Sequence, residues 1–286
     1  MSERGEAGIP PSSERGLSGP APPAPRAGSR IALVTGASAG IGRAFAEALA
    51  ARGHDVVLVA RDAGRLETLA AEIATRHGVA AQVLPADLTT ASGRERVAAR
   101  LADAAHPVDV LVNNAGLLTM GPFTEADVER ETAEIELNVV ALVHLTHAAA
   151  AAMAARGRGA IVNLSSIAGF APVPHSATYG ATKAFVNSFT HAVAEELRGT
   201  GVRLLLVCPG FTHTELHDRA GLGPTRLPEL LWQRADQVAE AALHDLDRGR
   251  MLSVPGAVNV ATVSAASVTP AWLTRRVARL LARRTG

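Results

Sequence analysis

Short runs of consecutive apolar residues recur along the chain and alternate with longer amphipathic or alanine-rich stretches. The runs cover residues 31–35, 55–60, 79–85, 108–112, 160–164, 202–207 and 251–254. Because they lack the alternation typical of a strand with one solvated face, they predict strands buried on both faces of a sheet. The stretches between them predict helices. We therefore expect an α/β fold with a doubly wound parallel sheet of about seven strands and helices on both faces.

Two of the predicted helices are long and rich in alanine. They cover residues 125–155 and 176–198. Their small side chains allow close packing, either against the parent sheet or against a second subunit. No linker interrupts residues 30–260, so the sequence predicts one domain there.

The two ends of the chain differ from this central region. Residues 1–29 are rich in Pro, Gly and Ser and contain no apolar core of a secretory signal, so we expect a disordered extension. Residues 261–286 predict a tail that contains a basic amphipathic helix. Such a helix can lie on an anionic membrane surface, but docking with a solvated arginine face is favoured.

Composition excludes several classes of protein. The formal net charge is +1, so the chain carries no general attraction for nucleic acid. Cys208 is the single cysteine and cannot form an internal disulfide, which indicates a reducing, cytoplasmic setting. No run of eighteen or more uniformly apolar residues is present, so no transmembrane helix is expected.

A glycine-rich segment follows the first predicted strand and precedes a helix. Residues 35–42 read TGASAGIG. Glycines at such a turn allow a tight bend and let a pyrophosphate approach the backbone at the positive end of the helix. A merely flexible turn is the alternative. The residues predicted to hold the cofactor here are Gly36, Ser38, Ala39, Gly40, Ile41 and Gly42.

The residue after the second strand bears on the choice of cofactor. Arg61 occupies this position, where a guanidinium can bind the 2′-phosphate of NADP(H). NADP(H) is therefore favoured over NAD(H). In the alternative reading Asp62 caps the next helix and Arg61 is simply solvated.

Two further segments are expected to line the adenine side of the cofactor. Asp87 and Leu88 follow the third strand, where Asp87 can accept a hydrogen bond from the adenine amino group; the alternative role is a helix N-cap. The small residues Asn114, Ala115 and Gly116 follow the fourth strand and let the backbone run close to the cofactor. Asn113 is interpreted as mainly structural.

The chain contains one tyrosine and one lysine, and these lie four residues apart as Tyr179 and Lys183. On a helix, residues at this spacing share a face. A nearby ammonium favours phenolate and should lower the pKa of the tyrosine. The pair therefore predicts an acid–base centre, whereas two stray residues on a surface helix would be the alternative.

Six motifs now stand in one order: TGASAGIG, ADL, NNAG, NLSS, YGATK and CPG. Over about residues 30–250 the sequence resembles the short-chain dehydrogenase/reductase family. The resemblance implies a Rossmann sheet, a nicotinamide cofactor and a Ser–Tyr–Lys centre with an added Asn. The family's positions fall on Ser166, Tyr179, Lys183 and Asn138. The family's Pro-Gly motif falls on Pro209 and Gly210, and the following Thr212 and Thr214 are expected to contact the cofactor.

The resemblance also implies a mechanism. A hydride passes between the cofactor and a carbonyl or alcohol, while Ser166 binds the substrate oxygen and Tyr179 transfers the proton. Lys183 lowers the pKa of Tyr179 and holds the ribose hydroxyls. Asn138 positions a water that links Lys183 to solvent.

The substrate region is readable only in its polarity. Residues 211–232 should form a lid rich in Phe, Leu and Trp, which predicts a small apolar carbonyl or alcohol substrate. No metal site is expected, because hydride transfer of this kind needs none and the paired histidines are typical of lids and surfaces.

The end of the catalytic region bears on how the chain assembles. The Gly-Gly-containing end strand of tetrameric family members is missing here, so among homo-oligomers a dimer is favoured over a tetramer. The alternative functions are an NAD-linked alcohol dehydrogenase working oxidatively and a non-catalytic NADP-binding or membrane-associated interaction protein. Retention of all four centre residues argues against loss of catalysis.

Overall fold

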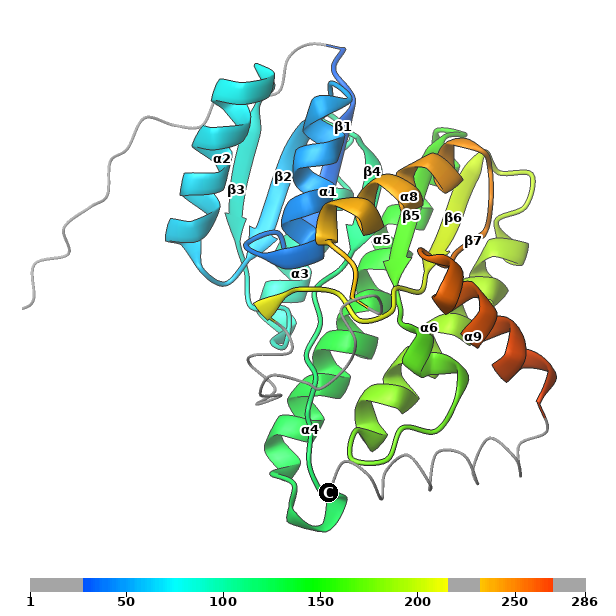
Figure 1. Ribbon diagram of the computed structural model, residues 1–286. Helices are drawn as coiled ribbons and strands as arrows, with labels where there is room; N and C mark the ends of the chain where they lie inside the picture. Colours follow the sequence, from blue (N-terminus) through cyan, green and yellow to red (C-terminus); the bar gives the residue numbers. More distant parts are fainter. Residues whose placement is uncertain (1–27, 216–231, 270–286) are drawn as a thin grey trace, which may run out of the picture.

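The computed structural model describes residues 28–215 and 232–269. Its core is one parallel seven-stranded sheet with the strand order β3-β2-β1-β4-β5-β6-β7, as Figure 1 shows. The predicted doubly wound α/β sheet is thereby confirmed. The strands are β1 (Ile31–Thr35), β2 (Asp55–Ala60), β3 (Ala81–Pro85), β4 (Val108–Asn113), β5 (Gly159–Leu164), β6 (Val202–Val207) and β7 (Leu252–Ser253).

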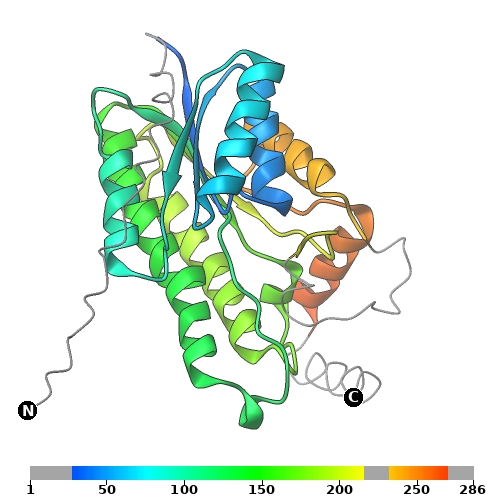
Figure 2. The same cartoon turned by 90° about the vertical axis from the view of Figure 1, so that its left-hand side faces the viewer.

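Helices cover both faces of the sheet (Figures 1 and 2). One layer contains α1 (Gly40–Ala51), α2 (Ala63–His77) and α8 (Ala235–Asp247), whose apolar side chains share one core cluster with the sheet. The other layer contains α3 (Ala91–Leu101), α5 (Leu142–Ala155) and α6 (Ala177–Glu196). Each central strand is therefore buried on both faces, which explains its uninterrupted apolar sequence.

The long helix predicted for residues 125–155 is not one regular α-helix. It consists of a short 3-10 turn η1 (Phe123–Glu125), α4 (Val128–Ile135), a π-helical segment η2 (Glu136–Ala141) and α5. A π segment carries extra residues per turn and is common at functional sites. Asn138 lies inside this segment, and its side chain is fully engaged by neighbouring elements, as described below.

Residues 128–155 are long and apolar enough to span a membrane by length and composition alone. In the fold, however, the α5 part of this stretch packs against the sheet through Leu142, Leu145 and Met153. A core helix passes the same test, so the finding is weak support for a membrane span.

Several predicted segments fall wholly or partly outside the described residues: the N-terminal extension up to residue 27, the lid residues 216–231 and residues 270–286 of the tail. Helix α9 (Ala257–Val268) crosses the boundary that the sequence places after residue 260 and packs against the 3-10 turn η3 (Ile167–Phe170).

Candidate active site

The predicted site residues gather at the carboxyl ends of the central strands. The glycine-rich turn leaves β1, the NNAG segment leaves β4, and Ser165 and Ser166 leave β5. Strands β1 and β4 are neighbours, although two strands lie between them in sequence and the strand order reverses there. In open α/β sheets ligands bind at this kind of switch point.

The turn before α1 has the shape and polarity that a dinucleotide pyrophosphate needs. A Cβ atom on Gly42 would lie 2.3 Å from the carbonyl oxygen of Gly36, and Gly36 itself adopts a positive φ of 65°. Ala39 caps α1 without a side-chain hydrogen bond, and no acidic residue lies in the first turn. The first amides of α1 are thus left without a side-chain cap, which fits an anionic ligand.

A residue that the sequence reasoning did not assign to the site holds this turn in place. The hydroxyl of Thr35 accepts hydrogen bonds from the backbone amides of Asn114 and Ala115, both at 3.0 Å. In return, Asn114 Nδ2 donates to the Thr35 carbonyl at 2.9 Å. The sequence signal that could have identified Thr35 is its position as the one polar residue at the end of an otherwise apolar strand. These bonds join the turn after β1 to the cofactor-facing loop after β4.

At the end of β2 the structure shows the helix cap that the alternative reading of the Arg61–Asp62 pair predicts. Asp62 caps α2, accepting a hydrogen bond from the amide of Arg65 at 3.0 Å. Arg61 is exposed next to it, at the edge where the adenosine end of the cofactor is expected. The cap and the 2′-phosphate contact are therefore compatible.

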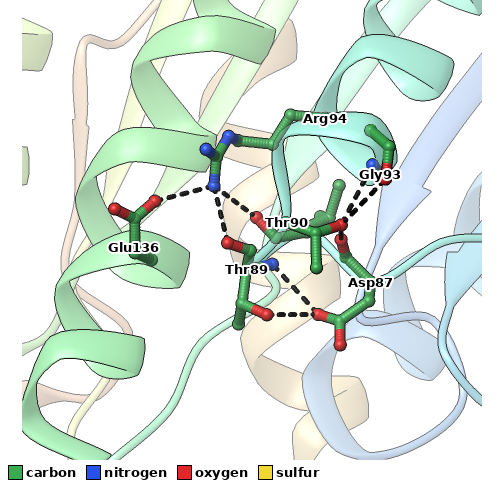
Figure 3. Close-up of polar contacts among 8 residues, drawn as sticks. Asp87, Thr89, Thr90, Gly93, Arg94 and Glu136 are labelled. Atoms are coloured by element: carbon green, nitrogen blue, oxygen red, sulfur yellow. Dashed lines mark hydrogen bonds and ion pairs between the residues drawn. The ribbon is translucent and has the colours of Figure 1, made fainter. Parts of the chain in front are cut away.

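Asp87 is not the N-cap of the following helix, so that alternative is wrong. Thr90 caps α3 by accepting from Gly93 N at 3.1 Å, while Asp87 Oδ1 accepts from the hydroxyl and the amide of Thr89 (Figure 3). Burial opposes ionisation of Asp87, but these bonds and the charge of Arg61 hold its pKa below the ordinary value. Asp87 is a carboxylate acceptor at the same edge as Arg61.

A buried arginine ties this adenine-side loop to the π segment. Arg94 Nη1 donates to the carbonyl of Leu88 at 3.2 Å and to that of Thr89 at 2.9 Å. The same nitrogen lies 2.7 Å from Glu136 Oε2 in η2, as Figure 3 shows. The guanidinium thus connects the loop after β3 with the helix that carries Asn138.

Tyr179 and Lys183 lie on the first turns of α6, and Lys183 Nζ is 5.5 Å from the centre of the tyrosine ring. Lys183 is almost fully buried, and its ammonium donates to the carbonyl of Leu164 at 3.0 Å. The Ser166 side chain lies beside the Tyr179 hydroxyl, close enough to lower the pKa of that hydroxyl. The predicted serine, tyrosine and lysine therefore come together at the end of β5.

The two neighbouring serines have different surroundings. Ser165 Oγ donates to the backbone carbonyl of Lys183 at 3.0 Å and is buried. Ser166 is the serine that lowers the pKa of the Tyr179 hydroxyl, and its Oγ accepts a hydrogen bond from Ala168 N at 3.1 Å. Ser165 braces α6 against β5, whereas Ser166 lines the reactive side.

The pKa of Tyr179 lies above its ordinary value in this structure, opposite in direction to the lowering predicted from Lys183. Burial raises the pKa of Tyr179 to about 12; the Ser166 side chain opposes this, and the charge of Glu134 adds to it. Burial also lowers the pKa of Lys183 to about 8. Burial disfavours the charged form of each group and is the largest cause of both shifts.

Asn138 is buried and joins three elements rather than facing Lys183 directly. Its Oδ1 accepts from Leu117 N at 2.9 Å, and its Nδ2 donates to the Leu117 carbonyl at 2.9 Å and to Thr182 Oγ1 at 3.1 Å. These bonds fix η2 against both the loop after Gly116 and α6.

The comparisons with known proteins agree with this arrangement. The family model described as "short chain dehydrogenase" matches residues 30–223, which is more than half of the chain. The chain belongs to the short-chain dehydrogenase/reductase family. It is accordingly an oxidoreductase with the hydride-transfer chemistry of that family, whose enzymes act on carbonyl and alcohol groups.

Several relatives within the short-chain dehydrogenase/reductase family are matched over more than nine tenths of their length. Sulfoacetaldehyde reductase 2 of Chromohalobacter salexigens is 36% identical, with 85% of this chain and 96% of the relative covered. The structure of a short-chain dehydrogenase from Sphingobium yanoikuyae in complex with NADPH is 39% identical, with a TM-score of 0.76 over 84% of this chain and 96% of that one. The bulky-bulky ketone specific alcohol dehydrogenase from Comamonas testosteroni is 34% identical, with a TM-score of 0.73 over 83% and 92%.

In this family member the two described ends of the lid are joined beside the Pro-Gly motif. Thr212 forms a bridge with Gln233, and the Trp232 ring stacks on His213 with centroids 4.7 Å apart. Thr214 meets the glycine-rich turn, since a Cβ on Gly40 would lie 2.9 Å from its methyl group. The remaining lid residues and His217 lie outside the described residues. Within those residues, no cluster of His, Cys, Asp and Glu could hold a metal ion.

Proposed function

We propose that this chain is an NADP(H)-dependent reductase of apolar ketones and aldehydes that also oxidises the corresponding alcohols. The observation that carries the proposal is the meeting of Ser166, Tyr179 and Lys183 at the end of β5. It lies on the same edge of the sheet as a turn that fits a dinucleotide pyrophosphate. Membership of a family of carbonyl and alcohol oxidoreductases supports the same reading.

The chain's own residues bind the substrate oxygen and move its proton. When bound, the nicotinamide cofactor supplies or accepts the hydride. The Ser166 hydroxyl donates a hydrogen bond to the substrate oxygen as negative charge develops there. Tyr179 gives its proton to that oxygen in the reductive direction and takes it back in the oxidative one. Lys183 holds the ribose hydroxyls and, as a buried cation, stabilises the tyrosinate that forms when Tyr179 gives up its proton.

The preference for NADP(H) rests on Arg61. Its guanidinium is exposed just past β2, where a 2′-phosphate can be bound by paired hydrogen bonds. The Sphingobium yanoikuyae neighbour was solved in complex with NADPH, which supports the same cofactor class. Asp87, Leu88, Asn114, Ala115 and Gly116 would line the adenine side, and Pro209, Gly210, Thr212 and Thr214 the nicotinamide and phosphate side.

An apolar substrate is proposed from the described ends of the lid. Phe211 and Trp232 face each other with ring centroids 5.7 Å apart. The Comamonas testosteroni neighbour is described as specific for ketones with two bulky groups, whereas the Chromohalobacter salexigens relative reduces sulfoacetaldehyde. The aromatic lid ends favour the first kind of substrate.

The test is a panel of bulky ketones, small aldehydes and sulfoacetaldehyde, assayed with NADPH and NADH, and of alcohols assayed with the oxidised cofactors. We expect the highest kcat/KM for a bulky ketone with NADPH. A preference for sulfoacetaldehyde would contradict the apolar-substrate proposal, and a preference for NADH would contradict the cofactor proposal. Binding of NADPH without turnover of any compound would favour a non-catalytic role.

We also propose a homo-oligomer. Large apolar side chains are exposed on the outer surfaces of α4 and α6, namely Val128, Ile135 and Phe185. Phe185 stacks on Phe189 with centroids 5.7 Å apart, which extends this apolar surface. Light scattering after gel filtration tests the proposal, with a dimer expected and a monomer contradicting it.

A further inference from the structure

Glu134 is a buried carboxyl that the proposed proton transfer does not yet use. It lies on α4, one helical turn before Asn138, and its exposed fraction is 0%. Its neighbours Glu129 and Arg130 on the same helix are exposed. A carboxyl is almost never fully buried without a partner, so its surroundings need an explanation.

The hydrogen-bond partners of Glu134 in the described part of the chain are neutral. Oε2 accepts from the amide of Thr119 at 2.8 Å and from its hydroxyl at 2.6 Å. Oε1 lies 3.4 Å from Asn138 Nδ2. These bonds can hold an anion in place, but they supply no opposite charge.

The opposite charge comes from Lys183. A Cβ on Gly116 would lie 3.2 Å from Asn138 Oδ1 and 3.8 Å from Lys183 Nζ, so both side chains face the same point. Asn138 in turn touches Glu134. The charge of Lys183 lowers the pKa of Glu134, and the charge of Glu134 raises the pKa of Lys183. Asn138 contacts Glu134 and lies beside Gly116 as Lys183 does, so Glu134 and Lys183 form a separated charge pair in one buried region.

We propose that Glu134 is a positioning residue that supplies the buried counter-charge of Lys183 and so sets the pH range in which Tyr179 exchanges its proton.

The titrations of the surrounding groups support this role. Burial and the like charge of Glu131 raise the pKa of Glu134 to about 7, against the Thr119 bonds and Lys183. Lys183 has a pKa of about 8, because burial outweighs the attraction of Glu134 and Cys208. Each group favours the charged form of the other, so the protonation of Glu134 depends on that of Lys183. Ionised Glu134 also raises the pKa of Tyr179.

The sign of the effect follows from the charge. Removing a negative charge makes the ammonium of Lys183 less favourable and the phenolate of Tyr179 more favourable. Both pKa values should therefore fall in the isosteric Glu134→Gln variant. For one charge at an effective dielectric constant of about 20, the shift is on the order of one pH unit.

The chain allows a direct measurement, because it contains one lysine and one tyrosine. With ¹³Cε-labelled lysine the unliganded protein gives a single lysine signal, whose pH titration belongs to Lys183. We expect Glu134→Gln to lower this pKa by about one unit. Glu129→Gln, the same change at an exposed position of α4, should leave it in place.

An unshifted Lys183 titration in Glu134→Gln, or an equal shift in Glu129→Gln, would overturn the inference. If Glu134→Gln does not fold, Thr119→Val serves instead. It removes a donor to the carboxylate, keeps Glu134 neutral to higher pH and should lower the Lys183 pKa in the same direction. No shift in Thr119→Val would then count against the inference.

The kinetic consequence rests on the proposed function. In Glu134→Gln the pH profile of kcat/KM for alcohol oxidation should rise at lower pH than in the wild type, and the profile for ketone reduction should fall at lower pH. A wild type without turnover would refute the proposed function while leaving the lysine titration as the test of Glu134. Active variants with unchanged profiles would refute the role of Glu134.

Discussion

At the scale of single residues, the adjacent serines Ser165 and Ser166 have different roles. Ser165 donates a hydrogen bond to the backbone of α6, whereas Ser166 lies beside the Tyr179 hydroxyl and lowers its pKa. The resemblance to the short-chain dehydrogenase/reductase family, whose serine lies thirteen residues before the tyrosine, assigns this role to Ser166 rather than Ser165. The pKa of the tyrosine could not be obtained in this way, because it depends on burial and on Glu134, which sequence spacing does not reveal.

Tyr179→Phe tests the proton-transfer role. The variant removes one oxygen and keeps the ring, so kcat should fall by about 10²- to 10⁴-fold, the usual contribution of general acid–base catalysis. The Kd for NADPH, measured by fluorescence titration, should change little because the hydroxyl is proposed to serve proton transfer. Turnover near the wild-type rate would remove Tyr179 from the catalytic role.

Arg61→Ala tests the choice of cofactor. Loss of a charge-assisted contact to the 2′-phosphate should weaken NADPH binding by about 10- to 100-fold and leave NADH binding nearly unchanged. Arg76→Ala, at an exposed arginine within α2, is the matched control. Equal losses for NADPH and NADH in Arg61→Ala would contradict a 2′-phosphate contact.

At the scale of elements, apolar runs were sufficient to find the strands, because both faces of a central parallel strand are buried. The break of the long helix into α4, the π segment and α5 was not predicted. Its cause is not local: Asn138 bonds to Leu117, and Arg94 of α3 bonds to Glu136. Contacts between segments distant in sequence leave no periodic signal. Glu134 was missed for the same reason, since on a charged helix nothing marks one glutamate as buried.

Arg94→Met tests the connection between the loop after β3 and the π segment. Methionine fills similar space but leaves the carbonyls of Leu88 and Thr89 and the Glu136 carboxylate without this donor. We expect a loss of about 2–4 kcal/mol in the free energy of unfolding, measured by urea denaturation, together with weaker NADPH binding.

The control for this change is Arg96→Met on the same helix, where the arginine is exposed and donates to the Pro85 carbonyl. It should cost no more than about 1 kcal/mol. Equal losses of unfolding free energy in Arg94→Met and Arg96→Met would show that the buried contacts of Arg94 stabilise the fold no more than an exposed contact does.

At the scale of the whole molecule, the fold gathers segments from β1, β4, β5 and α6 at one edge of the sheet and buries titratable groups among them. Lys183 and Glu134 lie within a core that stabilises their neutral forms. Such groups make the stability of the entire domain depend on pH, because folding changes their affinity for protons. The buried groups of the site should therefore affect the pH dependence of the free energy of unfolding as well as that of catalysis.

Glu134 should make the stability of the fold depend on pH. The pKa of Glu134 rises from 4.5 in the unfolded chain to about 7 in the fold, so the folded state holds its proton more tightly. The stabilisation is complete below pH 4.5 and is lost as the pH rises through about 7. Relative to Glu134→Gln, the wild type should therefore lose up to about 3 kcal/mol of unfolding free energy across this range. Denaturant unfolding at a series of pH values measures the difference, with Glu129→Gln as the exposed control. A difference between wild type and Glu134→Gln that stays constant with pH would mean that Glu134 ionises in the fold as it does in water.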